Sequence, residues 1–325
     1  MIKKFVSFDT VDPIKTSAEM FSEDPLQIEK SNQEIHLCGM SEKSSLIESG
    51  FVFFALAGLQ THGAHFVKEA IIKGAVLIVT DPEGKEILDE LGVSITTWVF
   101  LQPRKILSEM AGLFFKFKPE TIIGVTGTNG KTSVAHYVKQ IAEIFGEKSG
   151  VIGTTGITGT TTKSTDHTTP DPINLHSALQ WLADAGVKNV TIEASSHGLM
   201  QERLSGVNFL IAAFTNLSRD HFDYHKNLSN YFWAKAILFE RLLSENGIAV
   251  ICVNDKYGRK MLKIARSRSL KTLSIGHDKD CDVRIIKQNF HQNGQELEFF
   301  WCKKVWTVSL DLFGGFQAEN ILIAF

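Results

Sequence analysis

Short apolar runs and helical repeats of apolar residues alternate along most of the chain. Runs typical of buried strands lie at residues 121–125, 150–153, 190–192, 209–214 and 248–253. Apolar residues three or four positions apart predict helices at 133–145, 173–185 and 229–243. Alternation of this kind is typical of an α/β fold, in which a mostly parallel sheet carries helices on both faces.

The first third of the chain has a smaller set of elements. Strand-like runs at 51–56 and 75–79 flank a helical stretch at 66–72. A polar segment with a proline follows at 116–120 and is typical of a linker. These elements predict a small α/β unit of their own.

We therefore predict two domains, a small N-terminal α/β domain at 1–119 and a larger central domain at 120–325. Within the central domain, apolar and polar residues alternate at 280–310, which predicts a small antiparallel β insertion. The last residues, 314–325, have the pattern of an unfinished helix. We expect a further domain to be absent from the chain.

Charge and composition narrow the class of protein. The 325 residues include 34 basic and 36 acidic side chains, and no stretch concentrates Lys and Arg as a nucleic-acid surface would. Four cysteines are scattered without the spacing of a zinc or redox motif, which fits a reducing compartment. No apolar run approaches a membrane span or a signal peptide. We expect a cytoplasmic monomer that binds neither nucleic acid nor membranes.

A glycine-rich segment, GVTGTNGKTSV at 124–134, joins an apolar run to a helical one. Such a turn presents backbone N–H groups and the positive end of a helix dipole, and its glycines let a phosphate approach closely. Lys131 can contact the outer phosphates and the Thr132 hydroxyl can bind Mg²⁺, as in nucleotide-binding P-loops. The motif is the short form G-T-N-G-K-T, because Gly124 lies one position too far from Gly130 for the strict pattern. A turn that only reverses the chain is the alternative.

Two polar clusters follow predicted strands. EASSHG at 193–198 contains a carboxylate, Glu193, that can bind Mg²⁺, and hydroxyls that can hold a polar substrate. An ordinary acidic strand end with a solvated loop is the alternative. TNLSRDHFDYH at 215–225 can supply a metal ligand, an arginine for phosphate and a polar orienting network, or only caps and turns.

A lysine and a hydroxyl-rich loop are further candidates. Lys235 stands among aromatic residues and alanines at 231–239, so its ammonium must either reach water or lose its charge. The residues alone favour the first outcome. The loop DHTTPD at 166–171 can bind an acidic substrate or cap the helix that follows.

Five motifs, in this order, resemble the Mur ligase family. They are G-T-N-G-K-T, T-T-P-D, E-A-S-S-H-G-L-x-Q-x-R, T-N-L-S-R-D-H-x-D-Y-H and the A-K-A helix. They are most similar to the branch that adds the third peptide residue, usually meso-diaminopimelate or L-lysine, to UDP-N-acetylmuramoyl-L-alanyl-D-glutamate. The resemblance implies an ATP- and Mg²⁺-dependent ligase of peptidoglycan synthesis. In this mechanism, ATP phosphorylates the D-glutamyl carboxylate and the incoming amine displaces phosphate from the acyl phosphate.

The resemblance also implies roles for individual residues. The ATP loop would consist of Gly127, Thr128, Asn129, Gly130, Lys131 and Thr132. Metal ligands would be Thr132, Glu193 and His221. Lys131, His221 and Lys235 would take part in catalysis. Lys235 matches a lysine that the family carbamylates, a reaction that needs a neutral amine.

Further positions match residues that hold the UDP-muramoyl substrate. They are Ser44, Thr168, Thr169, Ser195, Gln201 and Arg203. Arg203 suits a phosphate or a carboxylate. Ser44 lies in GMSEKSS at 39–45, which lies over the family's G-I-T-x-D-S-R, and there Lys43 and Ser45 replace the Asp and the Arg.

Family members continue into a third, Rossmann-like domain with a D-N-P-R motif that selects the amino acid, and this sequence contains neither. For this chain alone we expect substrate and nucleotide binding with feeble or no ligase turnover. Two alternative interpretations stay open. One is a non-catalytic remnant that binds UDP-muramoyl peptide and ATP. The other is a ligase like folylpolyglutamate synthase, which is not expected to carry T-T-P-D together with S-S-H-G-L-x-Q-x-R.

Overall fold

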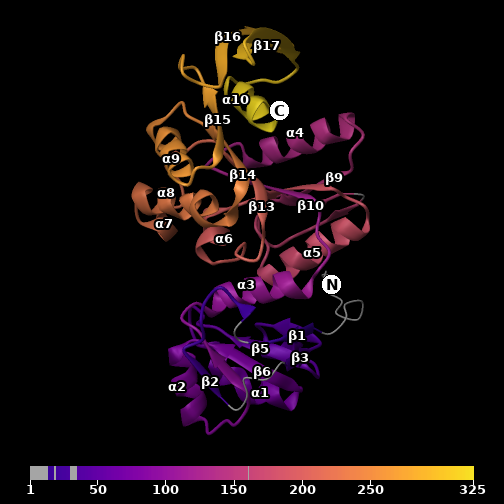
Figure 1. Ribbon diagram of the computed structural model, residues 1–325, viewed down its shortest axis with the longest axis vertical. Coiled ribbons are helices and arrows are strands. Elements are labelled where there is room, and N and C mark those ends of the chain that lie inside the picture. The colour runs from indigo at the N-terminus through magenta and orange to yellow at the C-terminus, as the bar shows by residue number, and fades with distance from the viewer. Residues whose placement is uncertain (1–13, 18–19, 30–34, 160) are drawn as a thin grey trace. The chain divides into compact units, whose positions relative to one another are not determined.

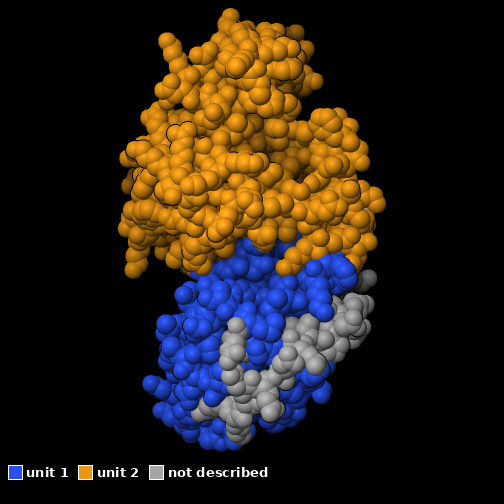
Figure 2. Space-filling model, viewed as in Figure 1, with its two compact units in different colours: residues 1–117, 171–180, 201–207 blue, residues 118–170, 181–200, 208–325 orange. Residues whose placement is uncertain are grey.

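The computed structural model describes residues 14–17, 20–29, 35–159 and 161–325 (Figure 1). The chain divides into two compact units, each made of several segments (Figure 2). Unit 1 comprises residues 1–117, 171–180 and 201–207. Unit 2 comprises residues 118–170, 181–200 and 208–325.

Unit 1 is built on a five-stranded sheet with the order β2-β7-β6-β5-β4, in which only β2 is antiparallel to its neighbour. The strands are β2 (Gln27–Glu29), β4 (Gly39–Ser41), β5 (Phe51–Ala55), β6 (Ala75–Thr80) and β7 (Thr97–Val99). A separate antiparallel pair is formed by β1 (Ile14–Thr16) and β3 (Ile35–Leu37). The strands predicted at 51–56 and 75–79 are confirmed.

Helices cover both faces of this sheet because β5 is apolar on both sides. Its Phe53 shares one buried cluster with Val67, and its Phe54 shares another with Met110. The helices are α1 (Val67–Ile72), α2 (Pro82–Glu90) and α3 (Pro103–Phe114). Short 3₁₀ turns lie at Ser44–Leu46 and Gly63–Phe66.

Unit 2 is built on an eleven-stranded sheet with the order β11-β10-β9-β12-β8-β13-β14-β15-β16-β17-β18. The strands from β9 to β16 in this order are parallel, and each edge is antiparallel. The strand bounds are β8 (Thr121–Thr126), β9 (Ser149–Gly153), β10 (Gly156–Thr158), β11 (Thr162–Lys163), β12 (Asn189–Glu193), β13 (Phe209–Phe214), β14 (Leu243–Cys252), β15 (Lys271–Gly276), β16 (Val283–His291), β17 (Gly294–Trp301) and β18 (Lys304–Leu310).

The helices after β8 are α4 (Lys131–Ile144), α5 (Pro172–Asp184), α6 (Ser196–Met200), α7 (Phe222–His225), α8 (Leu228–Ile237), α9 (Lys256–Ser267) and α10 (Phe316–Ala324). On one face of the unit 2 sheet, Val134 of α4 and Leu322 of α10 share a buried cluster with Val125 of β8 (Figure 1). On the other face, a Cβ at Gly124 would lie 2.9 Å from the side chain of Leu238, just after α8. Helices on both faces of a mostly parallel sheet confirm the predicted fold class. None of the helices described is both long and apolar enough to span a bilayer.

The structure refines two predictions from the sequence. The antiparallel segment at 280–310 is confirmed as β16, β17 and β18, and it extends the main sheet because Val283 pairs with Ile275 of β15. The predicted helix at 229–243 is wrong at its end. It leaves the α conformation after Ile237, makes a π-helical turn at Leu238–Leu242, and β14 begins at Leu243.

Asp255 joins α9 to the loop after β13. Its Oδ1 accepts hydrogen bonds from the backbone N–H groups of Tyr257 and Gly258, both at 2.7 Å, and so caps the helix. Its Oδ2 accepts a hydrogen bond from the N–H of Leu217 at 3.3 Å. One carboxylate therefore anchors two elements at the carboxyl edge of the sheet.

Candidate functional site

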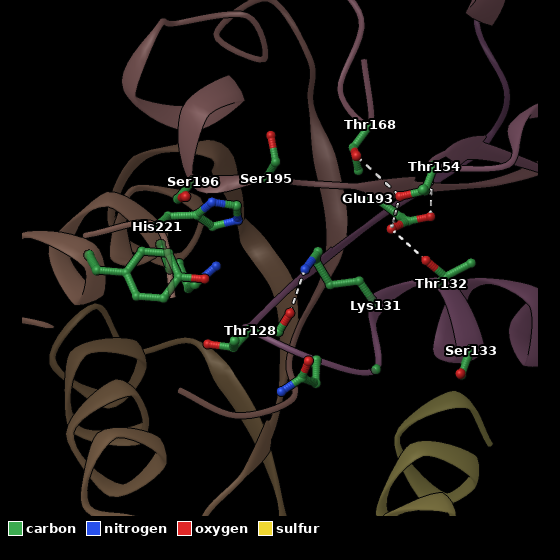
Figure 3. A pocket seen from close by; sticks show the side chains of 14 residues that line it. Thr128, Lys131, Thr132, Ser133, Thr154, Thr168, Glu193, Ser195, Ser196 and His221 are labelled. Carbon is green, nitrogen blue, oxygen red and sulfur yellow. Dashed lines mark hydrogen bonds between the residues drawn. The ribbon is translucent and has the colours of Figure 1, made fainter. Parts of the chain in front are cut away.

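A polar pocket of about 270 Å³ opens at the carboxyl ends of β8, β9 and β12 in unit 2 (Figure 3). In open α/β sheets this edge is where ligands bind. The pocket is lined by Thr128, Asn129, Gly130, Lys131, Thr132, Ser133, Thr154, Thr168, Glu193, Ser195, Ser196, His221, Tyr231 and Lys235. Five of the six residues of the predicted nucleotide loop, all except Gly127, therefore line one cavity together with Glu193, His221 and Lys235.

The loop between β8 and α4 has the backbone of an anion-binding turn. Gly127 has a φ of 146° and Gly130 a φ of 88°, which favour glycine. A Cβ at Gly130 would also overlap the side chain of Asn320 in α10. Gly130 is the N-cap of α4, so the unpaired N–H groups of the first helical turn lie in the pocket wall.

The segment after β13 holds this loop in place. The Thr215 hydroxyl donates to the carbonyl of Asn129 at 2.6 Å, and the N–H of Asn129 donates to Oδ1 of Asn216 at 3.1 Å. The N–H of Ser218 donates to Oγ1 of Thr128 at 3.0 Å. These bonds form the polar orienting network that the cluster at 215–225 predicted. The loop is therefore preorganised by its neighbour strand.

Lys131 is folded back onto its own loop. Its Nζ donates to the carbonyls of Gly127 at 3.0 Å and Thr128 at 2.8 Å. Burial lowers the pKa of Lys131, while the carboxylates of Glu193 and Asp220 act in the opposite direction. The ammonium thus lies at the position from which it can turn towards a phosphate group.

Glu193 is fully buried at the end of β12, and both of its oxygens are held. Oε1 accepts from the N–H of Thr154 at 2.9 Å, and Oε2 accepts from the hydroxyls of Thr132 at 2.9 Å and Thr154 at 3.2 Å (Figure 3). Gly153 gives this carboxylate its room, because a Cβ there would overlap it. The carboxylate is therefore fixed beside the first turn of α4.

This donor set fits a hard cation. The Glu193 carboxylate and the Thr132 hydroxyl are adjacent oxygen ligands, and Mg²⁺ usually takes one or two carboxylates together with waters and phosphates. His221 lines the same pocket with a half-exposed side chain and a left-handed φ of 51°. Within the described residues, no group of three or more His, Cys, Asp or Glu side chains gathers as a metal site. A cation here would therefore need ligands from outside the chain in addition to these side chains.

Lys235 does not reach water, so the interpretation favoured by its sequence neighbours is wrong. The residue is 1% exposed, its Nζ donates to the carbonyl of Gly127 at 2.8 Å, and it lies 4.3 Å from the centre of the Tyr231 ring. Burial, and then the charge of Lys131, hold the pKa of Lys235 well below its usual value. The buried helix α8 points the side chain inward because its neighbours Phe232 and Ala236 are themselves buried.

A cluster of rings borders Lys235. His225 is buried, and its Nε2 lies 2.9 Å from the Ser196 hydroxyl. Its ring centre lies 5.0 Å from that of Tyr231 and 5.5 Å from that of His197. Burial, helped by the charges of His197 and Lys235, lowers the pKa of His225 to about 4. His225 is therefore neutral at physiological pH and adds no charge beside Lys235.

The predicted substrate residues in unit 2 separate into two kinds. Thr168 and Ser195 line the pocket. Thr169 is 1% exposed and is not among the lining residues; its hydroxyl donates to the Glu193 carbonyl at 2.7 Å and accepts from the N–H of Ser195 at 3.0 Å. Thr169 therefore ties the loop to the end of β12 and does not present its hydroxyl to a ligand.

The other predicted substrate residues belong to unit 1. The Ser44 hydroxyl donates to Glu69 at 2.5 Å, and Glu69 also accepts from Lys73 at 2.8 Å. Arg203 donates twice to Oε1 of Gln201, at 3.1 and 2.6 Å. Each of these side chains therefore has a protein partner within its own unit.

The sequence did not single out three residues that line the pocket: Ser133, Thr154 and Tyr231. Thr154 is the most informative of them. It directly follows β9, which pairs with β12, so its place at a strand end was a usable signal. The position was missed because threonines after a strand are usually turn residues.

Comparison with known protein families identifies the family to which this chain belongs. The family profile of the Mur ligase middle domain matches residues 125–325, and that of the Mur ligase family catalytic domain matches residues 34–114. The chain therefore belongs to the Mur ligase family.

Two individual proteins of known name are similar to this chain over most of its length. The UDP-N-acetylmuramoyl-L-alanyl-D-glutamate–2,6-diaminopimelate ligase of Bradyrhizobium diazoefficiens is 38% identical over 305 residues, which are 91% of this chain and 61% of that protein. The protein of the same name from Zymomonas mobilis is 37% identical over 287 residues, 88% of this chain and 58% of that protein. The chain thus spans about three fifths of the length of these relatives.

Solved structures agree with this placement. A structure of a UDP-N-acetylmuramoyl-L-alanyl-D-glutamate–2,6-diaminopimelate ligase has a TM-score of 0.81 and 30% identity, covering 96% of this chain and 63% of that one. A folylpolyglutamate synthase of Mycobacterium tuberculosis has a TM-score of 0.53 and 20% identity, covering 68% of this chain and 57% of that one. The second likeness shows a shared fold only.

We predict that Lys235→Met stabilises the chain at pH 7 and that the gain fades as the pH rises. Because the pKa of Lys235 is lowered on folding, the unfolded state binds more protons between that pKa and about 10.4, and wild-type stability rises with pH across this range. The substitution removes the cost of this deprotonation, so the gain should be largest at pH 7 and smallest at pH 10. Urea unfolding at pH 7, 8.5 and 10 measures it, with the exposed Lys263→Met as control. An equal gain at all pH values would contradict a buried neutral amine.

Proposed function

We propose that the protein is an ATP-dependent amide ligase that adds meso-diaminopimelate to UDP-N-acetylmuramoyl-L-alanyl-D-glutamate. The observation that carries this proposal is one pocket of unit 2 in which a glycine loop, a buried carboxylate and a buried lysine converge. The family membership and the names of relatives at 33–38% identity support the choice of reaction. In this proposal residues 1–119 bind the UDP-muramoyl substrate and residues 120–325 bind ATP.

The nucleotide would bind at the start of α4. The N–H groups of the loop and Lys131 would bind the phosphates, and the α4 dipole would favour their charge. Mg²⁺ would be held by Thr132, Glu193 and His221, and when bound it would neutralise phosphate charge. Most of the catalysis would then come from fixed positions and fixed charges, as is usual for phosphoryl transfer.

The UDP-muramoyl dipeptide, which accepts the phosphoryl group, would bind at the side of the pocket opposite the nucleotide. We call it the acceptor. Thr168 and Ser195 present hydroxyls there, and they would hold the acceptor so that its carboxylate meets the terminal phosphate. Ser44, Gln201 and Arg203 are the proposed contacts in unit 1. Arg203 and Gln201 would exchange their mutual hydrogen bonds for bonds to the substrate.

Lys235 would act after carbamylation. Its neutral amine adds to CO₂, a C–N bond forms, and one proton is released, which leaves an anionic carbamate in place of the amine. The lowered pKa of Lys235 supports this step because it leaves the nitrogen lone pair available at neutral pH. The new anion would lie beside Lys131, whose charge would then stabilise it.

The carbamate is testable without turnover. We expect protein equilibrated with ¹³C-bicarbonate to give a carbamate carbon resonance that Lys235→Met lacks. Spectra are recorded at pH 8, because acid removes carbamates. A resonance of equal strength in both proteins would place the modification elsewhere.

Nucleotide binding is tested by Lys131→Ala. We expect the variant to bind a Mg²⁺ complex of a non-hydrolysable ATP analogue at least about tenfold more weakly, because one charge-assisted hydrogen bond to phosphate is worth roughly 1.5–3 kcal/mol. Calorimetry measures the Kd. Lys139→Ala on the same helix, where the lysine pairs with Glu143, should leave it unchanged. An unchanged Kd in Lys131→Ala would contradict the assignment of this loop as the nucleotide-binding site.

The ligase reaction is tested by phosphate release. We expect release above background only when ATP, Mg²⁺, the UDP-muramoyl dipeptide and diaminopimelate are all present. Release that ignores the dipeptide would indicate a plain ATPase. Tight dipeptide binding with no release, even when the remaining region of a relative is added, would favour the non-catalytic interpretation.

A further inference from the structure

Hydroxyl groups form a continuous chain from the acceptor side of the pocket to the buried carboxylate. Thr168 Oγ1 lies 3.1 Å from Thr154 Oγ1, and Thr154 Oγ1 lies 3.2 Å from Oε2 of Glu193 (Figure 3). The Thr132 hydroxyl reaches the same Oε2 at 2.9 Å from the nucleotide side. Thr154 is thus the residue of this hydrogen-bonded series that contacts both the loop at 165–169 and the carboxylate.

The chemistry of the groups fixes the direction of these hydrogen bonds. An ionised carboxylate only accepts hydrogen bonds, and a hydroxyl has one proton to donate. Thr154 must therefore donate its proton to Glu193 and accept one from Thr168. As a result, while these hydrogen bonds are intact, the Thr168 hydroxyl can accept hydrogen bonds from a ligand in the pocket but cannot donate one.

Thr154 contacts Glu193 a second time through its backbone. Its backbone N–H donates to Oε1 of Glu193 at 2.9 Å, so the residue holds both carboxylate oxygens. The neighbouring Gly153 leaves no side chain in the way. Loss of the Thr154 hydroxyl would leave the N–H contact intact but would leave Oε2 with the Thr132 hydroxyl alone and free Thr168 to turn.

We propose that Thr154 is a positioning residue that couples occupation of the acceptor loop to cation binding at Glu193 and Thr132. An acceptor group that takes the Thr168 proton breaks one link of the chain, and the Thr154 hydroxyl and the Glu193 carboxylate then readjust. Coupling of this kind is reciprocal, so the cation must change acceptor affinity by the same factor. The inference rests on the proposed function, because it assumes that Glu193 takes part in Mg²⁺ binding.

The chain offers a matched control beside Thr154. Thr155 is also an exposed threonine, but its hydroxyl lies 3.0 Å from Nε2 of His136 and does not line the pocket. Thr154→Val removes the hydroxyl and keeps the shape and the backbone N–H. Thr154→Ser keeps the hydroxyl. Thr155→Val makes the same chemical change one position away.

The experiment measures binding, not turnover. Calorimetry gives the Kd of a non-hydrolysable ATP analogue over a series of Mg²⁺ concentrations, with and without the UDP-muramoyl dipeptide. For the wild type we expect Mg²⁺-dependent binding that changes when the dipeptide is present. For Thr154→Val we expect the half-saturating Mg²⁺ concentration to rise at least about tenfold, the scale of one lost hydrogen bond to a charged group, and the dipeptide effect to vanish. Thr154→Ser and Thr155→Val should behave as the wild type does.

The outcomes separate this inference from the proposed function. If wild-type binding does not depend on Mg²⁺, the proposed role of Glu193 fails and this inference fails with it. If the wild type shows both effects and Thr154→Val keeps them, only the inference is overturned. Should Thr154→Val not fold, Thr168→Val cuts the same chain from its other end and must also abolish the dipeptide effect. A loss of equal size in Thr155→Val would indicate general loosening of the segment and would overturn the positioning role.

Discussion

The carbonyl oxygen of Gly127 accepts hydrogen bonds from the half-buried Lys131 and the buried Lys235, and the rest of the site depends on this arrangement. Burial first, and then the charge of Lys131, keep the pKa of Lys235 low, because two ammonium groups on one acceptor repel each other. This repulsion is smaller when one amine is neutral or when an anion binds beside the two groups. A triphosphate at the start of α4 and a modified Lys235 would each relieve the same repulsion. The affinity of the site for anions thus follows from how it is folded.

The sheet explains why residues far apart in sequence meet here. Because β9, β12, β8 and β13 are parallel neighbours, the residues that directly follow them emerge at one edge. Glu193 is the last residue of β12, and the glycine loop and the segment at 215–218 come directly after β8 and β13. A folylpolyglutamate synthase at 20% identity shares this fold, and in the present protein the pocket is lined by side chains at the strand ends.

Much of this could be predicted from the sequence, and the failures have physical causes. Buried strands such as β8 and β13 are almost wholly apolar, so their runs were evident, and glycines followed by Lys and Thr at the start of a helix are typical of a phosphate-binding turn. The amphipathic helix α9 was missed because it buries only Gly258, Met261 and Ala265 among charged residues. Lys235 was misjudged because burial depends on what packs around α8, which its own neighbours do not reveal. Thr154 was missed because its partners, Glu193 and Thr168, are distant in sequence.

Asp255 holds two elements with one carboxylate, and this affects how substitutions in either element act on the site. One oxygen holds the first turn of α9, and the other holds Leu217, in the segment that clasps the glycine loop. Helix integrity and loop geometry are therefore not independent properties of this protein. Damage at either element is transmitted to the other through a single carboxylate, so their energetic costs will not sum. Substitutions that disturb the first turn of α9 will therefore also act, through Asp255, on the segment at 215–218 that holds the glycine loop.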